Sequence, residues 1–308
     1  MILRSFTSRI SGFLFTAMIL CHSNLWASGP GLSVTVADEP AGVTVLSAAD
    51  ESSGGLELFA DAVDESAGNL PCFKIKTPSA VYYLEKEGAG LSSLLDRDGV
   101  DWIGFHPDKG TRASGEFRGF PNAVHQQDGS FFHPKNSGTE VSTTRVVYAG
   151  PDRITIAAES GNNNWAALWH FTADHATFTM TRMPDGYAYW ILYEGTPGGG
   201  YDDSDWWMTS AVREKTPLTV NHEGDIPDPE WIVFGDKATP RVLFLLHHED
   251  DSHIDKFYAM EKAMTVFGFG RQGMTKFLRT VPRSFSIGFV ESTSHQKISE
   301  ALKALSEQ

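Results

Sequence analysis

Residues 187–207, YAYWILYEGTPGGGYDDSDWW, join an aromatic strand, a glycine loop and an acidic, tryptophan-rich turn. Side chains alternate between the two faces of a strand, so Tyr189 and Tyr193 share one face while Glu194 lies on the other. Glu194 stands where the strand ends and the glycines begin. A carboxylate beside aromatic rings suits a sugar, because rings stack on a pyranose and carboxylates bond its hydroxyls. The alternative is a core strand that runs into a surface turn, with Glu194 in solvent.

Short strands surround this stretch. Segments rich in Val, Ile, Phe, Tyr, Trp and Thr recur between turn residues, and we expect strands over 72–76, 80–84, 143–148, 153–158, 166–171, 176–182, 187–193, 231–234, 241–247, 264–269 and 284–290. Helix signals are few. Residues 294–305 carry one apolar stripe, and residues 255–262 suggest one helical turn. The pattern predicts an all-β fold, a large antiparallel β-sandwich with a short C-terminal helix.

The N-terminal region differs from the rest in composition. Residues 1–27 hold a short basic start and an apolar run too short to span a bilayer, which indicates a signal peptide. Residues 28–70 contain eight acidic residues and no Lys or Arg, which predicts an acidic flexible leader. Residues 71–308 would then form the β-sandwich domain. We therefore expect a secreted or periplasmic protein.

Charge and cysteine content limit the partners and the sources of stability that the protein can have. The formal net charge is −14, and an acidic surface argues against nucleic acid and anionic membranes as partners. No stretch after the signal peptide is apolar enough for a membrane span. Cleavage would leave Cys72 as the single cysteine, so no intrachain disulfide can form. Stability must come from a packed core.

The first part of the expected domain resembles a known fold. In residues 73–102, strands lead into the turn sequence GLSSLLDRDGVDW at 90–102. This order is similar to the opening of the galactose-mutarotase-like supersandwich, and the resemblance covers roughly residues 71–290. Members of that superfamily include sugar epimerases, glycosidase and lyase domains, and binding domains. The resemblance implies a carbohydrate polymer or oligosaccharide as the partner, and it leaves the reaction open.

Residues 115–134, GEFRGFPNAVHQQDGSFFHP, form a long polar loop, and such loops in compact domains are often functional. The loop is distantly similar to the segment before a sugar-contacting histidine in hexose-phosphate epimerases, with His133-Pro134 in place of their His-Gly-Phe-x-Arg run. That likeness implies that His125 or His133 faces the ligand. A surface loop whose histidines only bond to backbone is the alternative.

A lyase acting on uronic-acid polymers needs a carboxylate neutraliser, a base and an acid. The loop supplies the first two as arginine, asparagine and histidine, and the strand at 187–193 supplies phenols. The candidate catalytic residues are Arg118, His125, His133, Tyr189 and Tyr193. The candidate substrate-binding residues are Glu116, Asn122, Glu194, Trp206, Trp207 and Arg271.

Residues 247–255, HHEDDSHID, combine imidazoles with carboxylates. That mixture suits a divalent cation such as Zn, and carboxylates alone suit Ca. The candidate ligands are His247, His248, Asp250 and His253. Their spacing matches no defined zinc motif, and a solvated polar turn is the alternative.

The sequence therefore predicts an exported carbohydrate-active enzyme that cleaves a uronic-acid-containing polysaccharide by β-elimination. A glycoside hydrolase is an alternative, and it would pair Glu194 with Asp203 or Glu116. A sugar epimerase on the same scaffold and a non-catalytic carbohydrate-binding protein also fit the residues named above.

Overall fold

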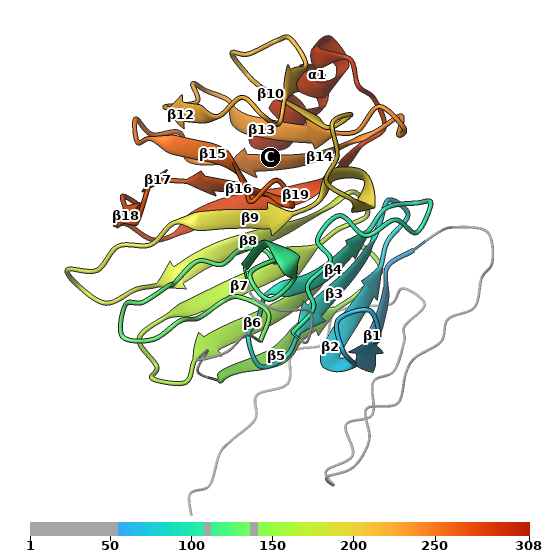
Figure 1. Cartoon of the computed structure of the whole chain (residues 1–308). Coiled ribbons are helices and arrows are strands. Elements are labelled where there is room, and N and C mark those ends of the chain that lie inside the picture. Colours follow the sequence, from blue (N-terminus) through green and yellow to red (C-terminus); the bar gives the residue numbers. More distant parts are fainter. Residues whose placement is uncertain (1–54, 108–111, 136–140) are drawn as a thin grey trace, which may run out of the picture. The chain divides into compact units, whose positions relative to one another are not determined.

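The computed structural model describes residues 55–107, 112–135 and 141–308. The expected signal peptide at 1–27 lies outside these residues. One layer of the fold is a nine-stranded antiparallel sheet in the order β11-β10-β13-β14-β19-β8-β7-β6-β5 (Figure 1). Its strands are β5 (Ser142–Ala149), β6 (Ile154–Ser160), β7 (Ala166–Phe171), β8 (His175–Arg182), β10 (Trp206–Thr209), β11 (Thr216–Pro217), β13 (Glu230–Gly235), β14 (Val242–His247) and β19 (Arg283–Val290).

The second layer consists of two four-stranded antiparallel sheets. One has the order β1-β2-β3-β4 and the other the order β12-β15-β16-β9. Their strands are β1 (Glu57–Asp64), β2 (Leu70–Lys76), β3 (Val81–Glu85), β4 (Leu91–Leu95), β9 (Ile191–Gly195), β12 (His222–Gly224), β15 (Asp255–Met260) and β16 (Met264–Phe269). A small hairpin of β17 (Arg271–Gln272) and β18 (Thr275–Lys276) follows β16.

Residues 119–123 connect the two sheets of the second layer. On one side, the Leu91 N–H of β4 donates to the carbonyl of Phe120 at 2.7 Å. On the other side, Gly119 and Glu194 of β9 exchange two backbone hydrogen bonds of 2.7 and 2.9 Å, and Leu192 donates to Pro121 at 2.7 Å. The polar loop expected from the sequence is thereby hydrogen-bonded along the edge of β9.

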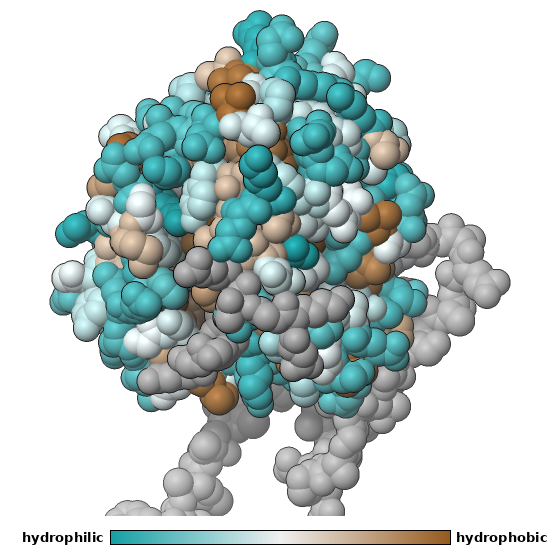
Figure 2. Space-filling model, viewed as in Figure 1, coloured by the Kyte–Doolittle hydropathy of each residue, from teal (hydrophilic) through white to brown (hydrophobic). Residues whose placement is uncertain are grey.

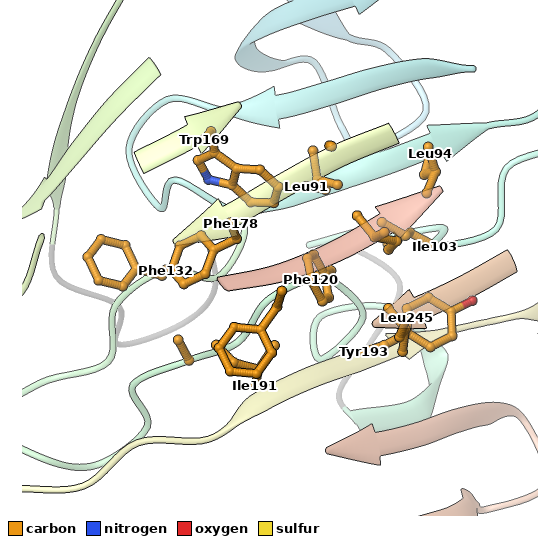
Figure 3. Packing of buried hydrophobic residues seen from close by; sticks show 14 of the residues in the cluster. Leu91, Leu94, Ile103, Phe120, Phe132, Trp169, Phe178, Ile191, Tyr193 and Leu245 are labelled. Carbon is orange, nitrogen blue, oxygen red and sulfur yellow. The ribbon is translucent and has the colours of Figure 1, made fainter. Parts of the chain in front are cut away.

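Aromatic side chains fill the space between the two layers. Tyr82 of β3 packs against Phe171 of β7 with ring centroids 5.4 Å apart, and Tyr193 of β9 packs against Phe234 of β13 at 5.5 Å. The close view in Figure 3 shows Tyr193 within the buried cluster. Burial of such large apolar side chains is the main favourable term in folding.

Helix α1 (His295–Ser306) covers the other face of the nine-stranded sheet at β10, β13 and β14. Its buried stripe is the one expected from the sequence, with Ile298, Leu302 and Leu305. These side chains share a cluster with Trp206. The all-β antiparallel class with a short C-terminal helix is confirmed, and none of the helices among the described residues is long and apolar enough to cross a membrane.

Two boundaries differ from the expectation. Residues 57–64, placed in the flexible leader, form β1 and pair with β2. The acidic composition made this segment resemble a solvated leader. The Asp64 carboxylate is nevertheless buried, because it accepts hydrogen bonds from Ser92 at 2.6 Å and Ser93 at 2.7 Å. The expected helical turn at 255–262 is wrong. That segment forms β15, because Phe257 enters the core and the strand pairs with β16.

The Asp96 carboxylate connects the turn after β4 to the nine-stranded sheet. It bonds to Arg241 Nη1 at 2.8 Å, to the indole N–H of Trp102 at 3.1 Å and to the backbone N–H of Val100 at 3.0 Å. Its side chain is fully buried. Removing Asp96 would take one of three carboxylates from Arg241 and leave the indole N–H of Trp102 without its acceptor.

We therefore expect Asp96→Ala to lower the free energy of unfolding by about 1–3 kcal/mol, measured by urea denaturation, because Arg241 keeps Asp98 and Glu291 as partners. The control is Arg97→Ala at the neighbouring exposed position, which should change it by less than about 0.5 kcal/mol. Equal effects of the two substitutions would contradict a structural role for the buried pair.

Candidate functional site

The candidate site lies where residues 119–123 run beside β9. Ile191 and Tyr193 of β9 point into the core, so the alternation of the strand turns Glu194 to the opposite face. The Asn122 amide donates to Glu194 Oε2 at 2.6 Å, and the backbone carbonyl of Asn122 accepts the indole N–H of Trp190 at 2.9 Å. Asn122 itself has φ of 32°, a region that Asn tolerates better than most residues.

Glu194 is only 5 % exposed, and burial raises the pKa of its carboxyl group to about 7. The hydrogen bond from Asn122 and the positive charge of Arg271 act in the opposite direction, because both favour the ionised form. The carboxyl group therefore changes protonation near neutral pH. Perturbed carboxyl groups of this kind are common in catalytic sites.

His133 lies next to this carboxyl group, with Nε2 4.0 Å from Glu194 Oε2. Its ring is buried and contacts two backbone carbonyl oxygens, Pro134 O at 2.7 Å and Phe117 O at 3.1 Å. Burial lowers the pKa of His133 to about 4, so the ring is neutral at pH 7. Both ring nitrogens face backbone carbonyl oxygens, and these contacts suit a structural histidine better than the expected catalytic base.

Gly119 allows the loop to approach His133. Its φ is 157°, and a Cβ atom there would lie 2.5 Å from Cδ of Pro134 and 3.1 Å from Nε2 of His133. No side chain fits such a distance. The glycine is therefore required where the loop, the histidine and β9 converge.

Trp190 is the centre of a second group of side chains beside Glu194. The guanidinium of Arg271 lies 5.1 Å from its ring centroid, and the ammonium of Lys276 lies 4.7 Å from it. The His125 ring stacks on it at 6.3 Å. Tyr258 of β15 contacts the other side of Arg271 at 5.2 Å. We call these residues, together with Glu194 and Asn122, the β9 site.

The ionisable groups of the β9 site have shifted pKa values. Burial lowers the pKa of Lys276 to about 8. The pKa of His125 is also lowered, first by burial and then by the charges of Lys276 and Arg271. His125 is half-buried, with its ring stacked on Trp190. Two cations and one carboxyl group with a pKa near 7 therefore share this region.

The expected phenol acids do not belong to the β9 site. Tyr193 points to the core and donates to Trp102 O at 2.5 Å, and Tyr189 donates to Thr280 O at 2.9 Å. Burial raises the pKa of both hydroxyls, that of Tyr193 well above its ordinary value. The period of the strand places them on the face opposite Glu194, so neither can donate to a ligand bound there.

Arg118, the expected carboxylate neutraliser, is also engaged elsewhere. Its guanidinium donates to the backbone carbonyls of Ala113 at 3.0 Å, Ala263 at 3.2 Å and Gly104 at 3.5 Å. It thus ties the loop to the turn between β15 and β16. Arg271, which the sequence predicted, is the cation that acts on Glu194, and Lys276, which it did not predict, joins Arg271 at the ring of Trp190.

The remaining predicted substrate residues lie away from the β9 site. Trp206 and Trp207 are each only 3 % exposed and pack into two different clusters, so neither offers a stacking platform to a sugar. Glu116 is half-buried on the loop. Asp203 lies beside Tyr201 in a separate small cavity of about 230 Å³.

The four predicted metal ligands do not converge. His248 contacts Ser286 Oγ at 2.7 Å, His253 stacks on Phe277, and Asp250 is exposed. His247 instead joins two residues that the spacing did not suggest.

Ligand atoms of Glu230, His247 and Asp251 all lie within 4.8 Å of one another, a set that could hold a metal ion. Arg283 Nη1 already contacts this set, at 3.0 Å from His247 Nε2 and 2.7 Å from Asp251 Oδ2.

Lys276 and Tyr258 are the members of the β9 site that sequence reasoning missed. A signal for Lys276 was present. Arg271 and Lys276 flank Gly273-Met274 at the spacing of a two-residue hairpin, which places the two cations opposite each other. Tyr258 fell in the segment expected to be a helical turn. The side of the molecule that Figure 1 shows is mostly hydrophilic in the space-filling view, with small separate apolar patches (Figure 2).

Comparison with known proteins identifies the fold. No protein-family profile and no curated protein matches the chain. Among solved structures, the protein HI1317 superposes with a TM-score of 0.52 at 13 % identity, over 79 % of this chain and 98 % of that one.

A galactose mutarotase related enzyme from Lactobacillus acidophilus gives a TM-score of 0.45 at 8 % identity, over 72 % of this chain and 99 % of that one. YeaD from Salmonella typhimurium, described as a candidate mutarotase, gives 0.44 at 10 % identity, over 79 % and 96 %. The chain has the galactose mutarotase-like supersandwich fold that the sequence resemblance implied. At such identities the likeness concerns the fold and assigns no reaction.

Proposed function

We propose that the chain is a carbohydrate-active enzyme in which Glu194 transfers a proton to and from a sugar bound at the β9 site. The observation that carries the proposal is the buried carboxyl group of Glu194, held by Asn122, with a pKa of about 7. A group whose pKa lies near the working pH is the most effective proton carrier. Trp190 is 1 % exposed and supports the site from within: its indole N–H bonds to Asn122 O, and its ring contacts the cations Arg271 and Lys276.

The interconversion of sugar anomers is the reaction that requires the fewest catalytic groups at this site. The Glu194 carboxylate takes the proton of the anomeric hydroxyl, and a solvent water gives a proton to the ring oxygen as the bond from C1 to that oxygen breaks. The open aldehyde turns about its C1–C2 bond. The ring recloses as Glu194 returns its proton to the carbonyl oxygen and the hydroxide takes back the proton of the attacking hydroxyl. One carboxyl group serves both directions. Hydrolysis needs two carboxyl groups that face one cleft about 5–9.5 Å apart, and Asp203 lines a separate small cavity with Tyr201.

Glu194→Gln keeps the shape of the side chain and removes the proton-accepting oxygen. We expect the rate of anomer interconversion, followed by polarimetry with freshly dissolved aldoses and uronic acids, to fall by about 10²–10⁴-fold. The matched control is Glu159→Gln on the exposed surface of β6, which should retain full activity. A wild-type protein that binds sugars without interconverting them would support the non-catalytic alternative.

The pKa of Glu194 predicts how the rate depends on pH. Below about pH 7 the raised pKa keeps the carboxyl group protonated, so it cannot accept a proton. We expect kcat/KM to fall about tenfold for each pH unit below about 7 and to level off above it, after subtraction of the uncatalysed rate. A flat profile from about pH 5 to about pH 8 would exclude Glu194 as the base.

β-Elimination on a uronic-acid polymer is the second candidate reaction. The observation that favours it is the cation pair Arg271 and Lys276 beside Tyr258, whose half-buried hydroxyl lies 3.4 Å from Arg271 Nη2. Cations that neutralise a carboxylate make the neighbouring C–H more acidic, and a phenol can protonate the leaving oxygen. Incubation with alginate, ulvan or glucuronan would produce the ultraviolet absorbance of a new double bond. No such absorbance with a folded sample would exclude this reaction.

We also propose that Zn rather than Ca is the divalent cation that fits Glu230, His247 and Asp251, because the set mixes imidazole with carboxylates. The guanidinium of Arg283 competes for the same ligand atoms. Zn²⁺ should therefore leave the melting temperature of the wild type unchanged and raise that of Arg283→Met, with reversal by a chelator.

Arg279→Met is the control for this experiment, because Arg279 is an exposed arginine four residues before Arg283. It should behave as the wild type does. If Zn²⁺ does not change the melting temperature of Arg283→Met, the metal proposal is wrong.

Export remains a proposal that rests on the basic start and apolar run of residues 1–27. Expression of the full chain followed by cell fractionation and N-terminal sequencing tests it. An uncleaved N-terminus in the cytoplasmic fraction would contradict it.

A further inference from the structure

The β17–β18 hairpin pairs two like charges. Arg271 and Lys276 stand directly opposite each other in the antiparallel register, so their side chains project from the same face. Both are buried, at 7 % and 8 % exposure, and both contact the ring of Trp190. Like charges directly opposite each other destabilise a strand pair, and burial strengthens their repulsion.

Neither cation forms a close ion pair with a carboxylate in the part of the chain that the structure describes, although the charge of Arg271 acts on Glu194. Arg271 Nε donates to Gly273 O at 3.0 Å, while its buried Nη1 has no hydrogen-bond acceptor there. Lys276 Nζ donates to the backbone carbonyl of His125. Within the described residues, no ion pair of 4.0 Å or less joins Arg271 or Lys276 to Asp or Glu, although such pairs form at several other cations, as between Lys256 and Glu223.

An unpartnered N–H of a buried guanidinium destabilises the protein, because the group loses its bonds to water and gains none in return. The ring of Trp190 offsets part of this cost through its cation–π contact with the guanidinium. The ring cannot supply an acceptor for Nη1. The ligand-free protein therefore keeps a positive site beside Glu194 that an anion would satisfy.

We propose that Arg271 and Lys276 bind the carboxylate of the sugar substrate, so that the β9 site takes uronic acids in preference to neutral sugars. The inference rests on the proposed function, since it assumes that the sugar lies beside Glu194. One free guanidinium N–H and one ammonium match the two oxygens of a carboxylate. The net charge of −14 makes such a positive site stand out from the rest of the chain.

Calorimetric titration of the full-length chain near pH 7 tests the proposal with glucuronate, galacturonate, glucose, galactose and glucose 6-phosphate. We expect the uronates to bind at least about tenfold more tightly than the matching neutral sugars, a difference of about 1.4 kcal/mol. Added salt should reduce this preference. Arg271→Met and Lys276→Met should each abolish the preference, while Arg279→Met, at an exposed arginine of the same segment, should keep it.

The melting temperature of the ligand-free variants gives a second readout. Because Lys276→Met removes one of two repelling charges, we expect the ligand-free variant to melt at the same temperature as the wild type or higher. A lysine with a purely structural role would lower the melting temperature on removal. This measurement also verifies that the variants fold.

Each outcome separates the two proposals. Equal affinity for uronates and neutral sugars would overturn the carboxylate assignment and leave the sugar site standing. Tighter binding of glucose 6-phosphate than of glucuronate would also overturn it. Uronate binding without any reaction would support the carboxylate site and overturn the enzymatic proposal. Absence of binding to every sugar would overturn both.

Discussion

The backbone hydrogen bonds of residues 119–123 hold the second layer of the sandwich together. This segment bonds to β4 through Phe120 and to β9 through Gly119 and Pro121. Without it, β4 and β9 would each expose an edge with unpaired N–H and C=O groups, which is costly in a buried layer. The same bonds bring Asn122 to Glu194. One short segment thus closes the fold and assembles the candidate site.

Backbone carbonyls determine which polar side chains are available for chemistry. Arg118, His133 and Tyr193 each bond to carbonyl oxygens of irregular segments. A sandwich with long connections has many such groups, and buried ones must find donors. Residues of catalytic type are therefore often used as structural donors. Arg271 differs from them because one of its N–H groups has no acceptor among the described residues.

Two buried ionic groups illustrate the contrast between structure and function. Arg241 is surrounded by Asp96, Asp98 and Glu291, so its charge is compensated within the protein. Arg271 and Lys276 face each other, and no described carboxylate pairs with either. A compensated charge stabilises the fold, whereas an uncompensated one lowers stability and favours a ligand of opposite charge. This difference depends on which partners are present, since all three side chains are buried cations.

The order of apolar and polar residues along the sequence predicted the all-β class, most strands and the apolar stripe of helix α1. It could do so because side-chain periodicity is a local property that burial on one face imposes. It also singled out Glu194, Asn122 and His125, since polar residues at a strand end and in a long loop are unusual. It placed Tyr189 and Tyr193 on the face opposite Glu194 and still assigned them a shared role.

Which residues meet depended on long-range pairing: the contact of residues 119–123 with β9, the hairpin that opposes Arg271 and Lys276, and the pairing that made residues 255–260 a strand. Such contacts join positions far apart in the chain, and local preference carries no information about them.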